Sequence, residues 1–207
     1  AFDGRTQQDA PEVCHILLQS MLSAYAQKCP VNDVMAYAIE TNMSCSACGH
    51  GWYSEPDQDF IIALAVTSDN TLQSSIDQMF RPESLQATCP NCQGSKIMKT
   101  KYIAMAPKVL IMHLKIFNAD GTKVKQPVTS QQNVRVASHE YQIFAVVTHS
   151  GERRDSGHYL SYAENNGTWN CFDDNDVKRN EHWQNENGQQ TQHFPYMFFM
   201  RKIAAAD

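Results

Sequence analysis

The sequence predicts an α+β fold, with a helix near its start and mainly strands after it. Apolar residues recur at helical spacing between residues 9 and 28, whereas the later apolar segments are short and alternating. Two Cys-x-x-Cys pairs divide the strand-rich part of the chain. With 207 residues, 42% of them hydrophobic, the chain is long enough for one substantial core that carries an inserted subdomain.

The first expected helix begins after Asp9 and ends near Lys28. Asp9 occupies an N-cap position, Pro11 lies in the first turn, and Glu12 follows Asp9 by three residues, as in a capping box. One face of this helix is an apolar stripe made of Cys14, Leu17, Leu18, Met21, Leu22 and Tyr25.

Strand-like segments dominate the rest of the chain. Alternating segments flank the first cysteine pair, and a second, short helix is expected over residues 72–80. The expected strands are 60–66, 109–117, 141–148 and 196–201, and residues 96–103 lead out of the second cysteine pair. The loop over residues 150–157 is charged and flanked by glycines, so we expect it to move.

The two cysteine pairs predict a metal site. Cys45 and Cys48 form one tight knuckle, Cys89 and Cys92 form the other, and two such knuckles complete a tetrahedral zinc site. Two disulfides are the alternative, but an odd total of seven cysteines favours a reducing compartment, the cytoplasm or the nucleus. We therefore expect a structural zinc ion that holds the insertion together and takes no part in chemistry.

Residues 157–174 predict a β-hairpin that carries a histidine and a carboxylate. If Asn166 and Gly167 form the turn, His158 and Asp173 are diagonal neighbours on one face, roughly 7–8 Å apart at their backbones. Asp173 then accepts from one imidazole nitrogen and leaves the other free to act as a base, as in a nucleophile–base–orienter triad. The alternative is an ordinary polar hairpin.

Charge and hydropathy exclude several classes of partner. The net charge of −5 and the pI near 5.9 give no basic patch for nucleic acid or an anionic membrane. No apolar run approaches the ~20 residues that a membrane helix needs. Basic protein segments are the better electrostatic match.

The order of five segments resembles the ubiquitin-specific protease family of deubiquitinating cysteine proteases. They are residues 7–12, 71–85, 106–117, 156–174 and 195–201, and both cysteine pairs lie between the first and third segments. The resemblance implies a papain-like hand with a thumb helix, zinc-ribbon fingers and an antiparallel β palm. It covers residues 1–207, with an incomplete thumb over 1–40, fingers over 41–102 and the palm over 103–207.

The same resemblance assigns roles to individual residues. It implies that His158 is the general base, that Asp173 orients it, and that Asp174 is an auxiliary polar partner. It also implies ubiquitin contacts: Tyr159 would line the channel for the ubiquitin tail, and Asp9 and Glu12 would face arginines near the ubiquitin carboxyl end. The helix cap is the alternative for these two carboxylates.

The nucleophilic cysteine of the family has no counterpart here. In the family it lies in a box upstream of the segment that matches residues 7–12, and nothing in this sequence resembles that box. Cys14 is expected to pack on the apolar stripe with a raised pKa, and Cys171 to point to the face opposite Asp173. Cys29 precedes a proline and has no implied base. His113 and His149 are expected to be structural.

Three hypotheses follow. The chain is the larger part of a deubiquitinase whose nucleophile comes from an upstream segment or another chain, or it is a ubiquitin-binding or scaffold module without catalysis. The third hypothesis is a zinc-ribbon module for nucleic acid or protein, which the low basic content between the cysteine pairs disfavours. With an incomplete thumb, we also expect the first helix to expose an apolar patch.

Overall fold

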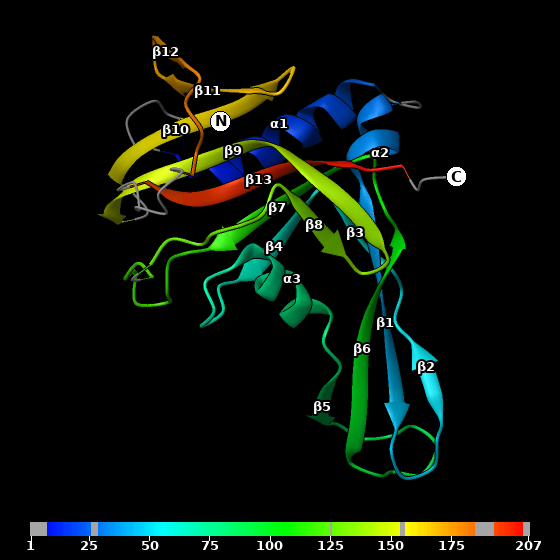
Figure 1. The fold of residues 1–207 in the computed structure, drawn as a ribbon. Coiled ribbons are helices and arrows are strands. Elements are labelled where there is room, and N and C mark those ends of the chain that lie inside the picture. Colours follow the sequence, from blue (N-terminus) through cyan, green and yellow to red (C-terminus); the bar gives the residue numbers. More distant parts are fainter. Residues whose placement is uncertain (1–7, 26–28, 125, 154–155, 185–192, 205–207) are drawn as a thin grey trace.

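Two sheets organise the chain, and Figure 1 shows the smaller one projecting from the larger as an arm. The computed structural model describes residues 8–25, 29–124, 126–153, 156–184 and 193–204. Residue 7 of the first family-like segment, residues 26–28 at the expected end of the first helix and residues 154–155 of the charged loop lie outside the described residues. Among the described helices, none is both long and apolar enough to cross a membrane.

The larger sheet is the palm. Its order is β12-β11-β10-β9-β13-β7-β4, and β8 pairs with β9. Its strands are β4 (Ile61–Ala65), β7 (Val109–Lys115), β8 (Asn133–Val136), β9 (His139–Arg153), β10 (Ser156–Asn165), β11 (Thr168–Asp173), β12 (Asp176–Arg179) and β13 (Phe194–Lys202). The β4–β7 pair is parallel, unlike the antiparallel palm expected, because the chain leaves β4 through α3 and the arm before it returns beside β4 as β7.

Helices cover both faces of the palm (Figure 1). On one face, α1 (Ala10–Ala24) and α2 (Pro30–Met35) pack in a cluster with Ile111 and Met197. On the other face, α3 (Leu72–Phe80) contributes to the main core. Helix α3 has the predicted limits. Helix α2 was not predicted, because six residues are too few to show a helical period.

Helix α1 buries little of its apolar stripe. Leu18 is its one buried residue, whereas Ile16, Leu17, Met21 and Tyr25 are between 41% and 59% exposed. The described helix ends at Ala24 with Tyr25 as its C-cap residue, short of the expected end. The expected apolar patch is therefore present on this helix.

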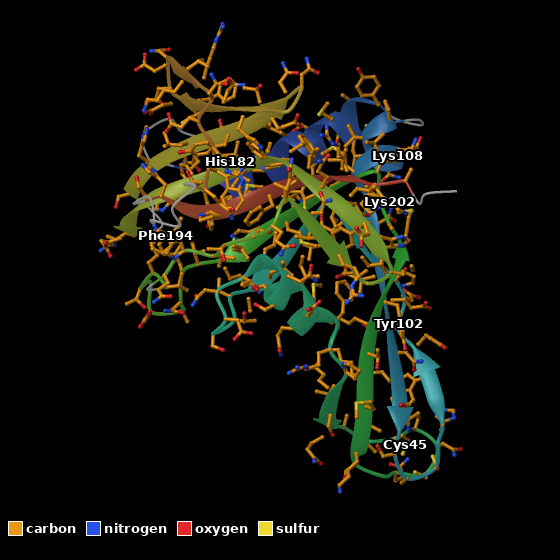
Figure 2. All side chains as sticks on the ribbon, viewed as in Figure 1. Cys45, Tyr102, Lys108, His182, Phe194 and Lys202 are labelled. Atoms are coloured by element: carbon orange, nitrogen blue, oxygen red, sulfur yellow. The ribbon has the colours of Figure 1, made fainter. Side chains whose placement is uncertain are left out.

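The arm is a five-stranded sheet built on the long pair β1 (Tyr37–Cys45) and β6 (Lys96–Met105). The short strands β2 (Gly51–Tyr53), β3 (Asp57–Asp59) and β5 (Glu83–Gln86) flank this pair. Both long strands run from the palm to the tip, where Figure 2 places Cys45. The predicted range of the fingers, 41–102, also contains α3 and strand β4 of the palm sheet. The chain therefore passes from the arm to the palm and back again within this range.

Candidate active site and zinc centre

The tip of the arm brings the four predicted cysteines together. Their sulfur atoms all lie within 4.8 Å of one another, with Cys45 Sγ 3.7 Å from Cys92 Sγ and Cys48 Sγ 3.8 Å from Cys89 Sγ. A tetrahedron with Zn–S bonds of about 2.3 Å has S–S edges of about 3.8 Å. The cluster therefore fits a closed Cys₄ zinc site, in agreement with the prediction of a structural ion.

Neighbouring groups prepare these thiols to bind a cation. Hydrogen bonds from the His50 backbone and then from the Asn91 side chain lower the pKa of Cys48 to about 6. The backbone N–H groups of Cys48 and Ala47 lower the pKa of Cys45. Gly94 donates its backbone N–H to Cys92 Sγ at 3.4 Å and so lowers the pKa of this thiol, but hydrogen bonds with the sulfur atoms of Cys48 and Cys45 raise that pKa to about 12. Because zinc binds thiolates, these donors favour the ligand form of the site.

The hairpin of β10 and β11 has the predicted turn and register. Asn165 pairs with Thr168 and Ser161 with Phe172, as the Asn-Gly turn requires. At the open end of the hairpin, His158 Nε2 lies 2.6 Å from Asp173 Oδ1. Hydrogen bonding from His158 lowers the pKa of Asp173, so the carboxylate is ionised at neutral pH.

This hydrogen bond determines what the imidazole can do. An ionised carboxylate only accepts, so Asp173 holds the His158 proton on Nε2 and leaves the Nδ1 lone pair available as a base. The side chain of His158 is 43% exposed, so a reacting group can reach it. Lys178 Nζ lies 3.7 Å from the second oxygen of Asp173. Asp174 lies close to both residues in an exposed turn, but no hydrogen bond joins it to His158.

Asp9 does not cap α1 with its side chain, so the predicted capping box is wrong. Its Oδ1 instead accepts from the Tyr196 hydroxyl at 2.8 Å and is 3.4 Å from the Tyr159 hydroxyl. The carboxylate therefore points away from the helix and toward the palm, where the hydroxyls of Tyr159 and Tyr196 bind it. Glu12 is exposed and lines a groove of about 380 Å³ between α1 and the palm, together with His15 and His113. Sequence reasoning assigned no role to Tyr196, which lies 187 residues from Asp9.

All seven cysteines lie in the described residues and are free thiols, and none is hydrogen-bonded to His158. Burial raises the pKa of Cys14 and of Cys171. Cys171 shares its face of β11 with Asp173, because the two residues are two positions apart and Cys171 pairs with Tyr162. Its predicted opposite orientation is therefore wrong. Its 0% exposure nevertheless makes it a core residue.

Each of the two histidines expected to be structural, His113 and His149, has a buried Nε2 atom without a hydrogen-bond partner among the described residues. Burial lowers the pKa of each to about 4. The His113 ring contacts the Tyr196 ring edge to face, and the His149 ring contacts it at a tilt. Both histidines therefore belong to the aromatic cluster beneath the Asp9 site.

These buried histidines predict an acid-sensitive fold. Above pH 6.5 both histidines are neutral in either state, but between pH 6.5 and 4 the unfolded chain binds protons that the folded chain excludes. The contribution of these two histidines to the free energy of unfolding is therefore largest well above pH 6.5. It is lost as the pH falls toward 4, by up to about 3 kcal/mol for each histidine. Burial also lowers the pKa of three further histidines, His139, His182 and His193.

Urea unfolding at pH 7 and pH 5 measures this loss. We expect His113→Gln to reduce the pH dependence by close to one proton, whatever its effect on stability at pH 7. His15→Gln is the matched control for the loss of one histidine, since that side chain is 40% exposed and lies 3.8 Å from Asp59. A slope that is equal in wild type and His113→Gln would show that His113 titrates normally in the folded state.

The hand-like palm with its zinc-binding arm and its histidine–aspartate hairpin places the chain in the class of papain-like thiol-protease folds. The chain belongs to the ubiquitin carboxyl-terminal hydrolase family, whose model matches residues 1–200. Family membership confirms the resemblance drawn from the five sequence segments.

Curated relatives share this family name. Ubiquitin carboxyl-terminal hydrolase 25 of Arabidopsis thaliana is 25% identical over 164 residues, which is 71% of this chain and 25% of the relative. The 17-like protein C of Mus musculus is 26% identical over 86% of this chain and 37% of its own length. The human 17-like protein 6 is 31% identical over 71% of this chain and 41% of its own length. The chain thus spans well under half of these relatives.

Solved structures show the same fold. The SAGA DUB module Ubp8/Sgf11/Sus1/Sgf73 bound to monoubiquitin matches with a TM-score of 0.83 and 21% identity, over 97% of this chain and 50% of that chain. The same module bound to ubiquitin aldehyde matches with a TM-score of 0.83 and 19% identity, again over 97% and 50%. At this identity the match establishes the fold, and the fold is the predicted hand.

Proposed function

We propose that this chain supplies the ubiquitin-binding surface and the acid–base pair of a thiol-dependent deubiquitinase. The observation that carries the proposal is the His158–Asp173 hydrogen bond of 2.6 Å. Tyr159, the residue after His158, reaches Asp9, so the strand that carries the base also contacts an acidic residue of the thumb. Ubiquitin bound in the neighbouring structures, and the names of the curated relatives, support this assignment.

In the proposed reaction, a thiolate attacks the carbonyl carbon of the terminal glycine of ubiquitin and forms a thioester, and the amine that followed this glycine leaves. His158 Nδ1 takes the proton of the thiol and returns it to the leaving amine, while Asp173 keeps the ring oriented and stabilises its charged form. Water then hydrolyses the thioester with His158 as base. Tyr159 lines the tail channel, and Asp174 is an auxiliary polar group at the same site.

The carboxylates of Asp9 and Glu12 are proposed to bind arginine side chains near the ubiquitin carboxyl end. Both tyrosine hydroxyls point to Oδ1 of Asp9, and no hydrogen bond of the described residues reaches its Oδ2. That oxygen is therefore available to a guanidinium group, which carboxylates bind through charge-assisted hydrogen bonds. The partner is ubiquitin or a ubiquitin conjugate.

We further propose that the nucleophile is not among the seven cysteines. Four of them form the zinc site, Cys14 and Cys171 have raised pKa values, and Cys29 is buried at the start of α2. A separate segment or chain would supply the thiolate. We also propose a thumb over 1–40, fingers over 41–102 and a palm over 103–207, with strand β4 of the palm sheet supplied from within the fingers range. We propose a location in the cytoplasm or nucleus, where free thiols persist.

A ubiquitin-binding scaffold without catalysis is the second candidate. It is favoured by the same finding that no cysteine is hydrogen-bonded to His158. Both candidates require ubiquitin binding, and they differ in whether a thiolate supplied from elsewhere restores cleavage.

The test uses ubiquitin with a thiol-reactive group at its carboxyl end. We expect the zinc-loaded chain to bind this probe and to show no covalent adduct by intact mass. An adduct that maps to Cys14, Cys29 or Cys171 would contradict the assignment and would identify the nucleophile. Failure of the folded chain to bind ubiquitin at all would overturn both candidates.

A further inference from the structure

Lys123 lies in an unusual position for a lysine. It follows the loop after β7, is half-buried, and extends its ammonium group into the end of the palm where Figure 2 places Phe194. Its Nζ donates to the backbone oxygens of His149 at 3.0 Å and Gly151 at 2.9 Å, and lies 3.3 Å from His149 Nδ1. It also lies 4.2 Å from the ring centre of Phe194. All three N–H donors of the ammonium group thus have an acceptor.

These contacts determine the tautomer of His149. An ammonium group has no lone pair, so Nδ1 of His149 must accept, and the ring proton must reside on Nε2. The ring is 0% exposed and is packed against Tyr159, with 4.9 Å between the ring centres. Burial lowers the pKa of Lys123 to about 8 and that of His149 to about 4, so at pH 7 the pair is an ammonium and a neutral imidazole.

The carbonyls that Lys123 binds belong to an irregular part of the β9–β10 pair. The register shifts between Ser156 and His158, and both strands carry a glycine there, at Gly151 and Gly157. A Cβ on Gly157 would lie 2.5 Å from His149 Nε2, and a Cβ on Gly151 would lie 2.8 Å from the Ser156 oxygen. The two backbones and the imidazole therefore fill this region with no room for a side chain.

The same region carries His158 and Tyr159. His158 pairs with Ser150, which lies between the two residues whose carbonyls Lys123 binds, and Tyr159 pairs with His149. Ser150 also places its hydroxyl 3.4 Å from the His158 oxygen. A displacement of residues 149–151 would therefore move the backbone of His158 relative to Asp173 on the next strand.

We propose that Lys123 is a positioning residue: its ammonium group holds His149 in one tautomer and residues 149–151 in place, and thereby sets the position from which His158 reaches Asp173. The catalytic consequence rests on the proposed role of His158. The structural part does not, because it concerns hydrogen bonds that exist without ubiquitin or a nucleophile.

The experiment is ¹⁵N NMR of the histidine side chains in the zinc-loaded 207-residue chain at pH 7. In wild type we expect His149 to be protonated on Nε2 alone and His158 to show a hydrogen-bonded Nε2 proton. Lys123→Met keeps the length of the side chain but removes the cation. We expect it to mix the two tautomers of His149 and to remove most of the His158 Nε2 proton signal through faster exchange. Lys123→Arg keeps the cation and is expected to retain the His158 signal.

Lys115→Met is the matched control, because this lysine lies at the end of β7 and is exposed, whereas Lys123 is half-buried. It should leave both histidine signals unchanged. A Lys123→Met spectrum identical to that of Lys115→Met would overturn the proposal. So would a wild-type His149 protonated on Nδ1, a result that needs no variant to fold. Absence of ubiquitin binding would refute the proposed function and leave these signals to decide the role of Lys123.

Discussion

A Cys89→Ser variant is expected to lose its zinc and, with it, the order of the arm tip. The buried apolar cluster at the tip consists of Cys45, Cys89 and Ile97, and the first two are zinc ligands. So small a core cannot hold five strands together, and a structural zinc ion contributes about 10–16 kcal/mol of apparent binding energy in small domains. Loss of one of four thiolates should therefore lower zinc affinity by orders of magnitude.

Zinc per chain by elemental mass spectrometry, and amide hydrogen exchange over residues 42–53 and 96–100, measure this effect. The palm should keep its protection, because its core cluster contains no residue of the arm tip. Cys14→Ala is the control, since this cysteine lies on α1 and not in the cluster. One equivalent of tightly bound zinc in Cys89→Ser would show that the four thiolates are not the ligand set.

An Asp9→Asn variant is expected to bind ubiquitin at least about tenfold more weakly, because a charge-assisted hydrogen bond contributes about 1.5–3 kcal/mol. An asparagine side chain still accepts from the Tyr196 and Tyr159 hydroxyls through its oxygen, so the local structure is retained. The change thus isolates the charge. Titration calorimetry at two salt concentrations measures the affinity, and the deficit should shrink at high salt.

Asp33→Asn is the matched control for this measurement. Asp33 is an exposed carboxylate on α2, so its replacement changes the net charge equally without altering the site. Equal affinities of Asp9→Asn and Asp33→Asn would show that Asp9 acts only through the two tyrosines.

Local patterns predicted the parts of the molecule that local forces determine. The limits of α3 follow from its apolar period and from Thr71, whose side chain accepts the N–H of Ser74. The register of the His158–Asp173 hairpin follows from a two-residue turn, because the turn leaves one pairing of the strands. The Cys₄ site follows from two knuckles, each of which is complete within four residues.

The remaining features depend on contacts between distant segments. The capping signal at Asp9 was correct in position and wrong in function, because the hydroxyls of Tyr159 and Tyr196 compete for the carboxylate. No sequence pattern predicts that competition. The parallel β4–β7 pair and the contacts of Lys123 with His149 likewise arise only when the sheet is assembled.

Binding of ubiquitin with and without its carboxyl-terminal tail tests the central claim most directly. The claim is that Asp9, Tyr159 and His158 form one site for that tail. Calorimetry with full-length ubiquitin and with ubiquitin that lacks its last residues, both against the zinc-loaded chain, separates this site from the rest of the surface. We predict that removal of the tail abolishes most of the affinity, and that Asp9→Asn has no further effect on the truncated ligand. Equal affinity for the two forms of ubiquitin would contradict the account.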